Sequence, residues 1–89
     1  MFFVYIIHST KTDGYYCGQT IDLINRLSEH NSGETKSIKN GIPWILVGYL
    51  VFLTRQEAVL NEKKIKARGI KRWLEYSANI LNNNLNFSR

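Results

Sequence analysis

The chain has 89 residues, of which 44% are hydrophobic and 12% aromatic, which is enough for one small folded domain and excludes a disordered chain. The formal net charge of +5 favours an anionic partner such as nucleic acid, although a basic surface can also serve solubility alone. The single cysteine, Cys17, excludes an intrachain disulfide, and with only two histidines a structural zinc site is not expected.

The amino-terminal third predicts a β-hairpin. Residues 2–8 are β-branched and aromatic and predict a buried strand, residues 9–14 a turn, and residues 15–20 a second strand. Gly18 inside the second strand predicts a close approach by another group. The apolar start lacks a basic segment and a cleavage site, so we expect no signal peptide, no membrane span and a cytoplasmic protein.

The middle of the chain predicts a helix, a loop and a strand. Residues 22–31 form the helix, with Asp22 or Thr20 as its N-cap and an apolar face made by Leu23, Ile24 and Leu27. Residues 32–43 are polar and predict a loop. Residues 44–53 are apolar along nearly their whole length and predict the third strand.

Two helices are expected to follow. Thr54 and Glu57 make a capping-box pattern at the start of a helix over residues 55–67, and Gly69 ends it. A last helix over residues 70–78 packs Trp73 into the core, and the asparagine-rich tail, residues 79–89, is expected to fray. The order ββαβαα predicts a mixed α/β (α+β) domain over residues 1–78, with a small three-stranded, mainly antiparallel sheet flanked by helices.

A glutamate interrupts the apolar stripe of the helix over residues 55–67. Glu62 lies four residues after Ala58 and three before Ile65, in the middle of that stripe. A carboxylate on a buried helix face is costly unless it is paired or holds a metal. Beside a basic surface, this position favours an oxygen ligand for a hard cation, and ion pairing remains the alternative.

A second set of candidates borders the leucine stripe of the helix over residues 22–31. Arg26 and His30 are four residues apart and therefore neighbours on the helix surface. An arginine at this position can bind a phosphate through two parallel hydrogen bonds. The alternatives are an arginine stem packed on apolar surface with its head in water, and a surface or capping histidine.

Tyrosines and cations complete the candidates. Tyr5 and Tyr16 lie in the first two strands, where a hydroxyl can orient a water, donate to a phosphate or accept a proton, or simply pack in the core. A basic run follows Glu62 and predicts a surface that tracks phosphates without reading sequence. The run and two loop lysines comprise Lys63, Lys64, Lys66, Arg68, Lys71, Arg72, Lys36 and Lys39.

The order and spacing of these residues resemble the GIY-YIG nuclease family, named for two short strand motifs. The matching segments, from residue 2 to about residue 76, are Phe3-Val4-Tyr5, Tyr16-Cys17-Gly18, Gly18-Gln19-Thr20, Asn25-Arg26-Leu27, Glu29-His30-Asn31, Pro43-Trp44, Glu57-Ala58, Glu62 and Ile65-Lys66. Phe3 replaces the first glycine of the name and Cys17 its second isoleucine, at positions where the family is tolerant.

The resemblance implies a divalent-metal-dependent endonuclease that hydrolyses phosphodiester bonds in DNA. It implies that Glu62 binds one Mg²⁺ or Mn²⁺ and that Arg26 holds the scissile phosphate. Tyr5 is then the general base or the group that orients the water, and Tyr16 supports the phosphate or the nucleophile. His30 assists proton transfer or contacts the leaving group.

Several alternatives stay open. A noncatalytic nucleic-acid-binding domain could keep this fold, and a protein-interaction subunit could use the open sheet edge or the tail. Larger relatives carry an asparagine near the end of the module, which does not align here, and added DNA-binding domains. The chain is therefore expected to be unselective or to take its target choice from a protein partner. The sequence is compatible with DNA or RNA as the substrate and with several forms of that substrate. It is equally compatible with repair, recombination or DNA uptake as the pathway.

Overall fold

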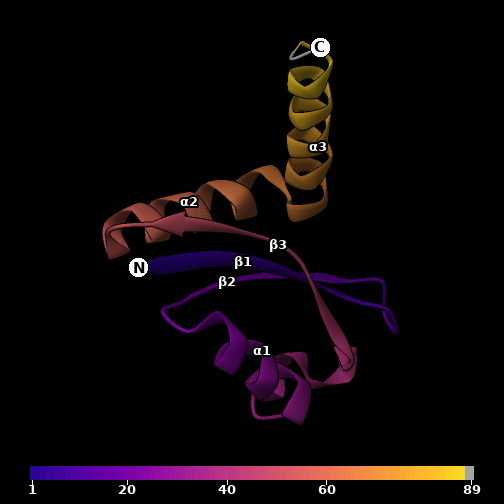
Figure 1. Ribbon diagram of the computed structural model, residues 1–89. Coiled ribbons are helices and arrows are strands. Elements are labelled where there is room, and N and C mark those ends of the chain that lie inside the picture. Colours follow the sequence, from indigo (N-terminus) through magenta and orange to yellow (C-terminus); the bar gives the residue numbers. More distant parts are fainter. Residues whose placement is uncertain (88–89) are drawn as a thin grey trace.

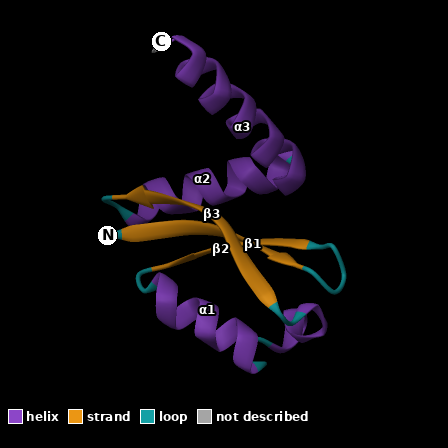
Figure 2. Ribbon diagram, turned by 45° about the vertical axis from the view of Figure 1, so that its right-hand side comes forward, coloured by secondary structure: helices purple, strands orange, loops and turns teal. Residues whose placement is uncertain are grey.

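The computed structural model describes the backbone of residues 1–87 and the side chains of residues 1–78. Its elements are β1 (Phe2–Ser9), β2 (Tyr15–Thr20), α1 (Leu23–Ser32), the 3₁₀ helix η1 (Lys36–Gly41), β3 (Trp44–Phe52), α2 (Arg55–Arg68) and α3 (Ile70–Phe87). The strands form an antiparallel sheet in the order β2-β1-β3. Helix α1 covers one face of this sheet and α2 covers the other (Figures 1 and 2). The predicted fold class and element order are confirmed.

The pairing of the strands fixes which residues lie beside Tyr5. Tyr5 in the central strand β1 is paired with Gly18 of β2 and with Tyr49 of β3. At the turn, the Ser9 hydroxyl accepts hydrogen bonds from the backbone of Lys11 and Thr12, at 3.2 and 3.0 Å. A β-bulge interrupts the β1–β3 pairing between Ile6 and Ile7. Six β1 residues thus pair with β2 without a break, which holds Tyr5 and Tyr16 in fixed relation.

Both predicted helix starts are capped. The Asp22 side chain accepts a hydrogen bond of 3.1 Å from the Asn25 backbone, so Asp22 is the N-cap of α1. The Thr54 hydroxyl accepts from the Glu57 backbone at 3.2 Å and lies 2.9 Å from the Glu57 carboxylate. Only one half of the capping box is thus realised, because Glu57 accepts from the Thr54 hydroxyl and not from its backbone.

Each face of the sheet has its own apolar cluster. The cluster under α2 consists of Val4, Ile6, Cys17, Ala58 and Ile65, with Trp73 among the partly buried residues packed against it. The cluster under α1 consists of Tyr5, Ile7 and Trp44, with Leu23 and Leu27 packed against it. The alternation of strand side chains between the two faces explains this division.

The structure differs from the sequence-based expectation in three places. The loop contains η1, and Ile24, predicted on the apolar face of α1, is 85% exposed. Helix α3 continues to Phe87, well past residue 78, and rises away from the sheet (Figure 1). Asparagine is a modest helix former, and no glycine or proline interrupts that segment. None of the helices over the described residues is long and apolar enough to cross a membrane.

Candidate active site

Tyr5 is held inside the domain with its hydroxyl against the neighbouring strand. Its side chain is 1% exposed, and a Cβ on Gly18 would lie 2.6 Å from the Tyr5 hydroxyl oxygen. The hydroxyl therefore occupies the space that any other residue at position 18 would fill. The close approach predicted at Gly18 is confirmed, and the approaching group is Tyr5.

His30 faces the Tyr5 hydroxyl from α1. Its Nε2 lies 2.7 Å from the Tyr5 oxygen, and its Nδ1 lies 2.8 Å from the Thr35 hydroxyl. The ring is 0% exposed, so the surface-histidine alternative is wrong. Burial, followed by the nearby positive charge of Arg26, lowers the pKa of His30 below its ordinary value of 6.5, while Glu29 opposes this. His30 is therefore neutral at neutral pH.

Tyr16 and Arg26 complete what we call the tyrosine–histidine cluster: Tyr5, Tyr16, Arg26 and His30. The Tyr16 ring lies 6.4 Å from the Tyr5 ring and 5.4 Å from the His30 ring, between centroids. Arg26 is half-exposed and pairs with Glu29 at 3.3 Å. Burial raises the pKa of Tyr5 to about 12, although the adjacent Arg26 guanidinium opposes the shift. The Tyr5 hydroxyl is thus protonated in the free protein.

Glu62 lies on α2, on the other side of the sheet from this cluster. Its neighbours along the stripe, Ala58 and Ile65, are 0% and 2% exposed, and its own side chain is 18% exposed. The carboxylate pairs with the Lys66 ammonium at 2.8 Å. Glu62 therefore sits at the rim of the buried stripe, and this ion pair offsets part of the cost of its burial.

The outer edge of β2 connects Glu62 with the cluster. Tyr16 and Cys17 are consecutive in β2 and point to opposite faces. Burial, followed by the charge of Glu62, raises the pKa of Cys17 to about 11. The pKa of Lys66 is raised first by its hydrogen bond to Glu62, with smaller contributions from Tyr16 and Cys17. Because β2 is an edge strand, a ligand bound beside it can contact side chains from both faces of the sheet.

One unpartnered oxygen lies on the Glu62 side of β2. Gln19 pairs with Val4, whose side chain belongs to the cluster under α2, so Gln19 faces the same side as Glu62. Its side-chain oxygen is buried and has no hydrogen-bond partner within the described residues. A buried amide oxygen without a partner is unusual, and it is a ligand type that hard cations accept.

Glu62 and Gln19 offer oxygen atoms, the ligand type that hard cations such as Mg²⁺ prefer. The described residues contain no group of three or more histidine, cysteine, aspartate or glutamate side chains placed to hold a metal. Mg²⁺ keeps several waters and is bound through one or two carboxylates together with substrate phosphates. Glu62, with Gln19 on the same side, is consistent with such a site once Lys66 releases the carboxylate.

The predicted cations are all exposed, but they do not form one stripe. Lys36 and Lys39 lie on η1, beside α1, and the others lie on α2 and at the start of α3. Two of these others have partners: Lys66 pairs with Glu62, and the Arg68 guanidinium lies 4.3 Å from the Tyr76 ring centroid. The basic residues thus stand on both sides of the sheet.

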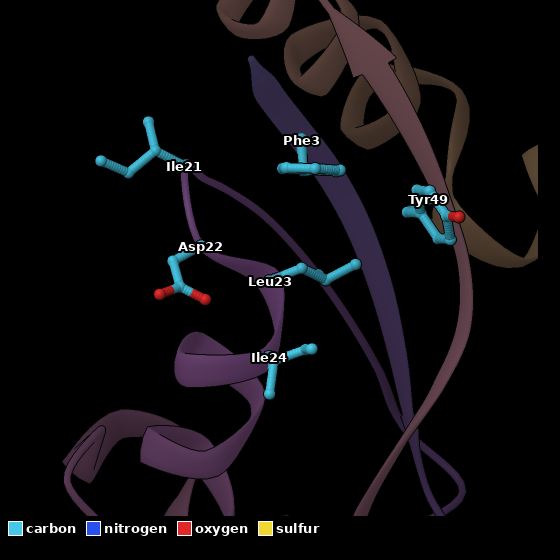
Figure 3. A pocket seen from close by; sticks show the side chains of 6 residues that line it. All are labelled: Phe3, Ile21, Asp22, Leu23, Ile24 and Tyr49. Atoms are coloured by element: carbon cyan, nitrogen blue, oxygen red, sulfur yellow. The ribbon is translucent and has the colours of Figure 1, made fainter.

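A hollow on the surface lies apart from these residues. It has a volume of about 650 Å³ and lies between β1, β3 and the start of α1 (Figure 3). Its lining consists of Phe3, Ile21, Asp22, Leu23, Ile24 and Tyr49. Phe3, which departs from the name motif, contacts Tyr49 edge-on at 6.0 Å between ring centroids. The hollow contains none of the predicted catalytic side chains and is not the candidate active site.

Two residues near the candidate site have no role that the sequence predicts. Thr35 lies in the segment predicted as a polar loop, and its contact with His30 depends on how the chain turns after α1. Gln19 was part of the resemblance but carried no predicted role. Both residues can be identified only when the side-chain directions of the strands and the end of α1 are known.

Comparisons with known proteins identify the family of the chain. Residues 1–74 match the family model of the GIY-YIG catalytic domain. A UPF0213 protein of Haloquadratum walsbyi is 36% identical over 66 residues, which are 73% of this chain and 73% of that protein. No solved structure matches the chain. The family model covers most of the chain, which therefore belongs to the GIY-YIG nuclease family.

Proposed function

We propose that the protein is a divalent-metal-dependent endonuclease that hydrolyses phosphodiester bonds in DNA. The observation that carries this proposal is the buried Tyr5–His30 hydrogen bond of 2.7 Å beside Arg26. A core tyrosine needs a partner for its hydroxyl, but it needs neither a buried neutral histidine nor an adjacent arginine. The same three groups suit proton transfer next to a phosphate.

The pKa of Tyr5 defines how it would act. With a pKa raised to about 12, Tyr5 is not a preformed phenolate at neutral pH. It can still accept a proton from water while it passes its own proton to His30 Nε2. In that relay one O–H bond of water and the O–H bond of Tyr5 break, and a new O–H bond and an N–H bond form. The hydroxide so formed attacks the phosphorus and displaces the leaving oxygen in line.

Arg26 and Tyr16 would hold the phosphate during this step. Arg26 is half-exposed and next to Tyr5, so its guanidinium can offset negative charge that grows on the phosphate oxygens. Tyr16 packs near both Tyr5 and His30 and can donate its hydroxyl hydrogen to a phosphate oxygen. Glu62, with Gln19, would hold the cation. The cation would act as a Lewis acid on the phosphate when bound.

A cleavage assay tests the proposal. Purified protein is incubated with labelled single-stranded, duplex and branched DNA in Mg²⁺, Mn²⁺ or EDTA. We expect metal-dependent cutting that Glu62→Ala abolishes without loss of DNA binding. Tyr5→Phe should lower kcat about 10²- to 10⁴-fold, as loss of a general base does. The matched control is Tyr15→Phe, which removes the adjacent hydroxyl on the opposite face of β2 and should leave kcat unchanged.

A second candidate is a noncatalytic nucleic-acid-binding domain. The Glu62–Lys66 ion pair favours it, because the pair explains a carboxylate on this stripe without any metal. A binding domain would retain DNA in a salt-dependent manner and show no turnover with either metal. Cutting that persists at full rate in Glu62→Ala would contradict the metal role assigned to Glu62.

A further inference from the structure

The hydroxyl of Thr35 has a partner that its position in the chain does not require. Thr35 is the N-cap residue of η1, where a threonine side chain ordinarily accepts a hydrogen bond from the backbone of the next turn. Its side chain makes no such bond here and instead lies 2.8 Å from His30 Nδ1. The left-handed conformation of Gly33, with a φ of 86°, ends α1 and turns the chain back toward His30.

The contacts of Tyr5 decide the direction of the hydrogen bonds. The Tyr5 hydroxyl has His30 Nε2 at 2.7 Å as its hydrogen-bond partner within the described residues, and the nearby Arg26 guanidinium offers donors only. Within the described residues, His30 Nε2 is thus the acceptor available to the Tyr5 hydrogen. A neutral histidine carries one ring hydrogen, so an accepting Nε2 requires that the hydrogen be on Nδ1. The Nδ1–H then donates to the Thr35 hydroxyl oxygen.

From this geometry we infer that Thr35 is a positioning residue that stabilises the Nδ1–H tautomer of His30, the tautomer that the Tyr5 contact requires. By accepting from Nδ1–H, it keeps Nε2 free to receive the Tyr5 proton. When that proton arrives, both ring hydrogens have partners: Nε2–H faces Tyr5 and Nδ1–H faces Thr35. The other tautomer would point Nε2–H at the Tyr5 oxygen and leave the Tyr5 proton without an acceptor. The catalytic part of this inference rests on the proposed nuclease function, whereas the tautomer does not.

Nitrogen-15 NMR of the His30 ring in the full chain tests the tautomer directly. We expect a protonated-type signal at Nδ1 and an unprotonated-type signal at Nε2 in the wild type at neutral pH. The chain has two histidines, so His8→Asn assigns the signals. A wild-type ring protonated at Nε2 would overturn the inference, and this result does not depend on any cleavage activity.

Two variants test the role of the Thr35 oxygen. Thr35→Val has nearly the same shape and lacks the acceptor, so the preference for Nδ1–H should weaken, and Thr35→Ser should restore it. A preference that persists unchanged in a folded Thr35→Val would contradict the inference. Thr12→Val is the matched control, because it removes a hydroxyl from the exposed hairpin turn and should change nothing.

Kinetics test the catalytic consequence. Thr35→Val should lower kcat about tenfold, the lower end of the loss that follows when the hydrogen-bond partner orienting a metal-bound histidine is removed, with KM nearly unchanged. Thr35→Ser should recover most of kcat. A KM effect without a kcat effect would show that Thr35 serves substrate binding and would overturn the positioning role. If the wild type cuts no substrate, the proposed function fails, and the NMR result still decides the tautomer.

Discussion

The absence of a side chain at Gly18 has a direct role in the site. The Tyr5 hydroxyl lies where a Cβ would be, at 2.6 Å, and this placement brings it to His30 Nε2. The position is therefore specified by Tyr5 and not by the backbone of β2. Glycine here is a requirement of the proposed proton relay, although strand interiors ordinarily disfavour glycine.

Gly18→Ala should consequently impair activity more than folding. The added methyl group pushes the Tyr5 hydroxyl away, and a displacement of about 1 Å at a reacting group can cost about 100-fold in rate. The measurement is kcat with the best DNA substrate, beside a thermal melt. Gly48→Ala is the control, because nothing lies within 4 Å of a Cβ at Gly48. Equal effects of the two variants on kcat would contradict the role given to Gly18.

The buried His30 also predicts a pH dependence of stability. Burial, then the charge of Arg26, lowers the pKa of His30 in the folded protein below its unfolded value of 6.5. The unfolded chain therefore binds more protons as the pH falls, and the free energy of unfolding should decrease below pH 6.5. Glu29 opposes the shift from the same helix, and Tyr5 and Tyr16 face the ring from the sheet.

Urea denaturation between pH 7.5 and pH 5 measures this effect. The loss of stability should be smaller in His30→Gln, which has no group to titrate at that position. It should be retained in His8→Asn, since His8 is a partly exposed residue paired with Asp13 in the hairpin. The same slope in wild type and His30→Gln would show that other groups cause the dependence.

At the scale of elements, one asparagine joins α1 to β3. The Asn31 side chain accepts a hydrogen bond from the Trp44 backbone N–H at 2.6 Å and donates to the Trp44 carbonyl at 3.0 Å. It thus satisfies both backbone groups of the first residue of β3. These two hydrogen bonds anchor the end of α1 that carries His30.

Asn31→Ala should therefore destabilise the domain. Two backbone groups lose their partners, and each unsatisfied group costs about 1–3 kcal/mol when it is buried. Because Trp44 is only 7% exposed, we expect a decrease of about 2 kcal/mol in the free energy of unfolding. Asn61→Ala is the control, since Asn61 makes one exposed bond within α2. A decrease no larger than in that control would contradict the anchoring role.

Periodicity predicted most of the elements, and packing explains what it missed. The hairpin, β3 and the start of α2 follow from runs of β-branched residues and from caps, which are local signals. Ile24 was misplaced because α1 meets the sheet through Leu23 and Leu27, which leaves Ile24 outside. The predicted roles of the site residues came from the family resemblance. Their distances and the Thr35 contact depend on tertiary geometry that no local pattern carries.

At the scale of the whole molecule, the sheet divides the proposed catalytic groups. The cluster under α1 holds Tyr5 and His30, and the α2 side holds Glu62. The edge of β2 is the boundary that both sides share. Exposed cations stand on both sides of the sheet as well.

This distribution predicts binding dominated by phosphate contacts. With a net charge of +5, DNA affinity should fall steeply with salt, and removing one contacting cation should reduce the log–log slope by about one. Lys71→Ala at the start of α3 is expected to do so. Lys11→Ala in the hairpin turn keeps the same net charge as that variant and should leave the slope unchanged. Fluorescence anisotropy with labelled DNA at several salt concentrations measures both.

The division of the core into two faces also provides two built-in optical probes. The chain has two tryptophans. Trp44 lies in the cluster under α1, and Trp73 packs against the cluster under α2. In Trp73→Phe the intrinsic emission reports the α1 layer alone, and in Trp44→Phe it reports the α2 layer alone. Each layer of this small domain can therefore be followed separately by its own fluorophore during unfolding or DNA binding, without an attached dye.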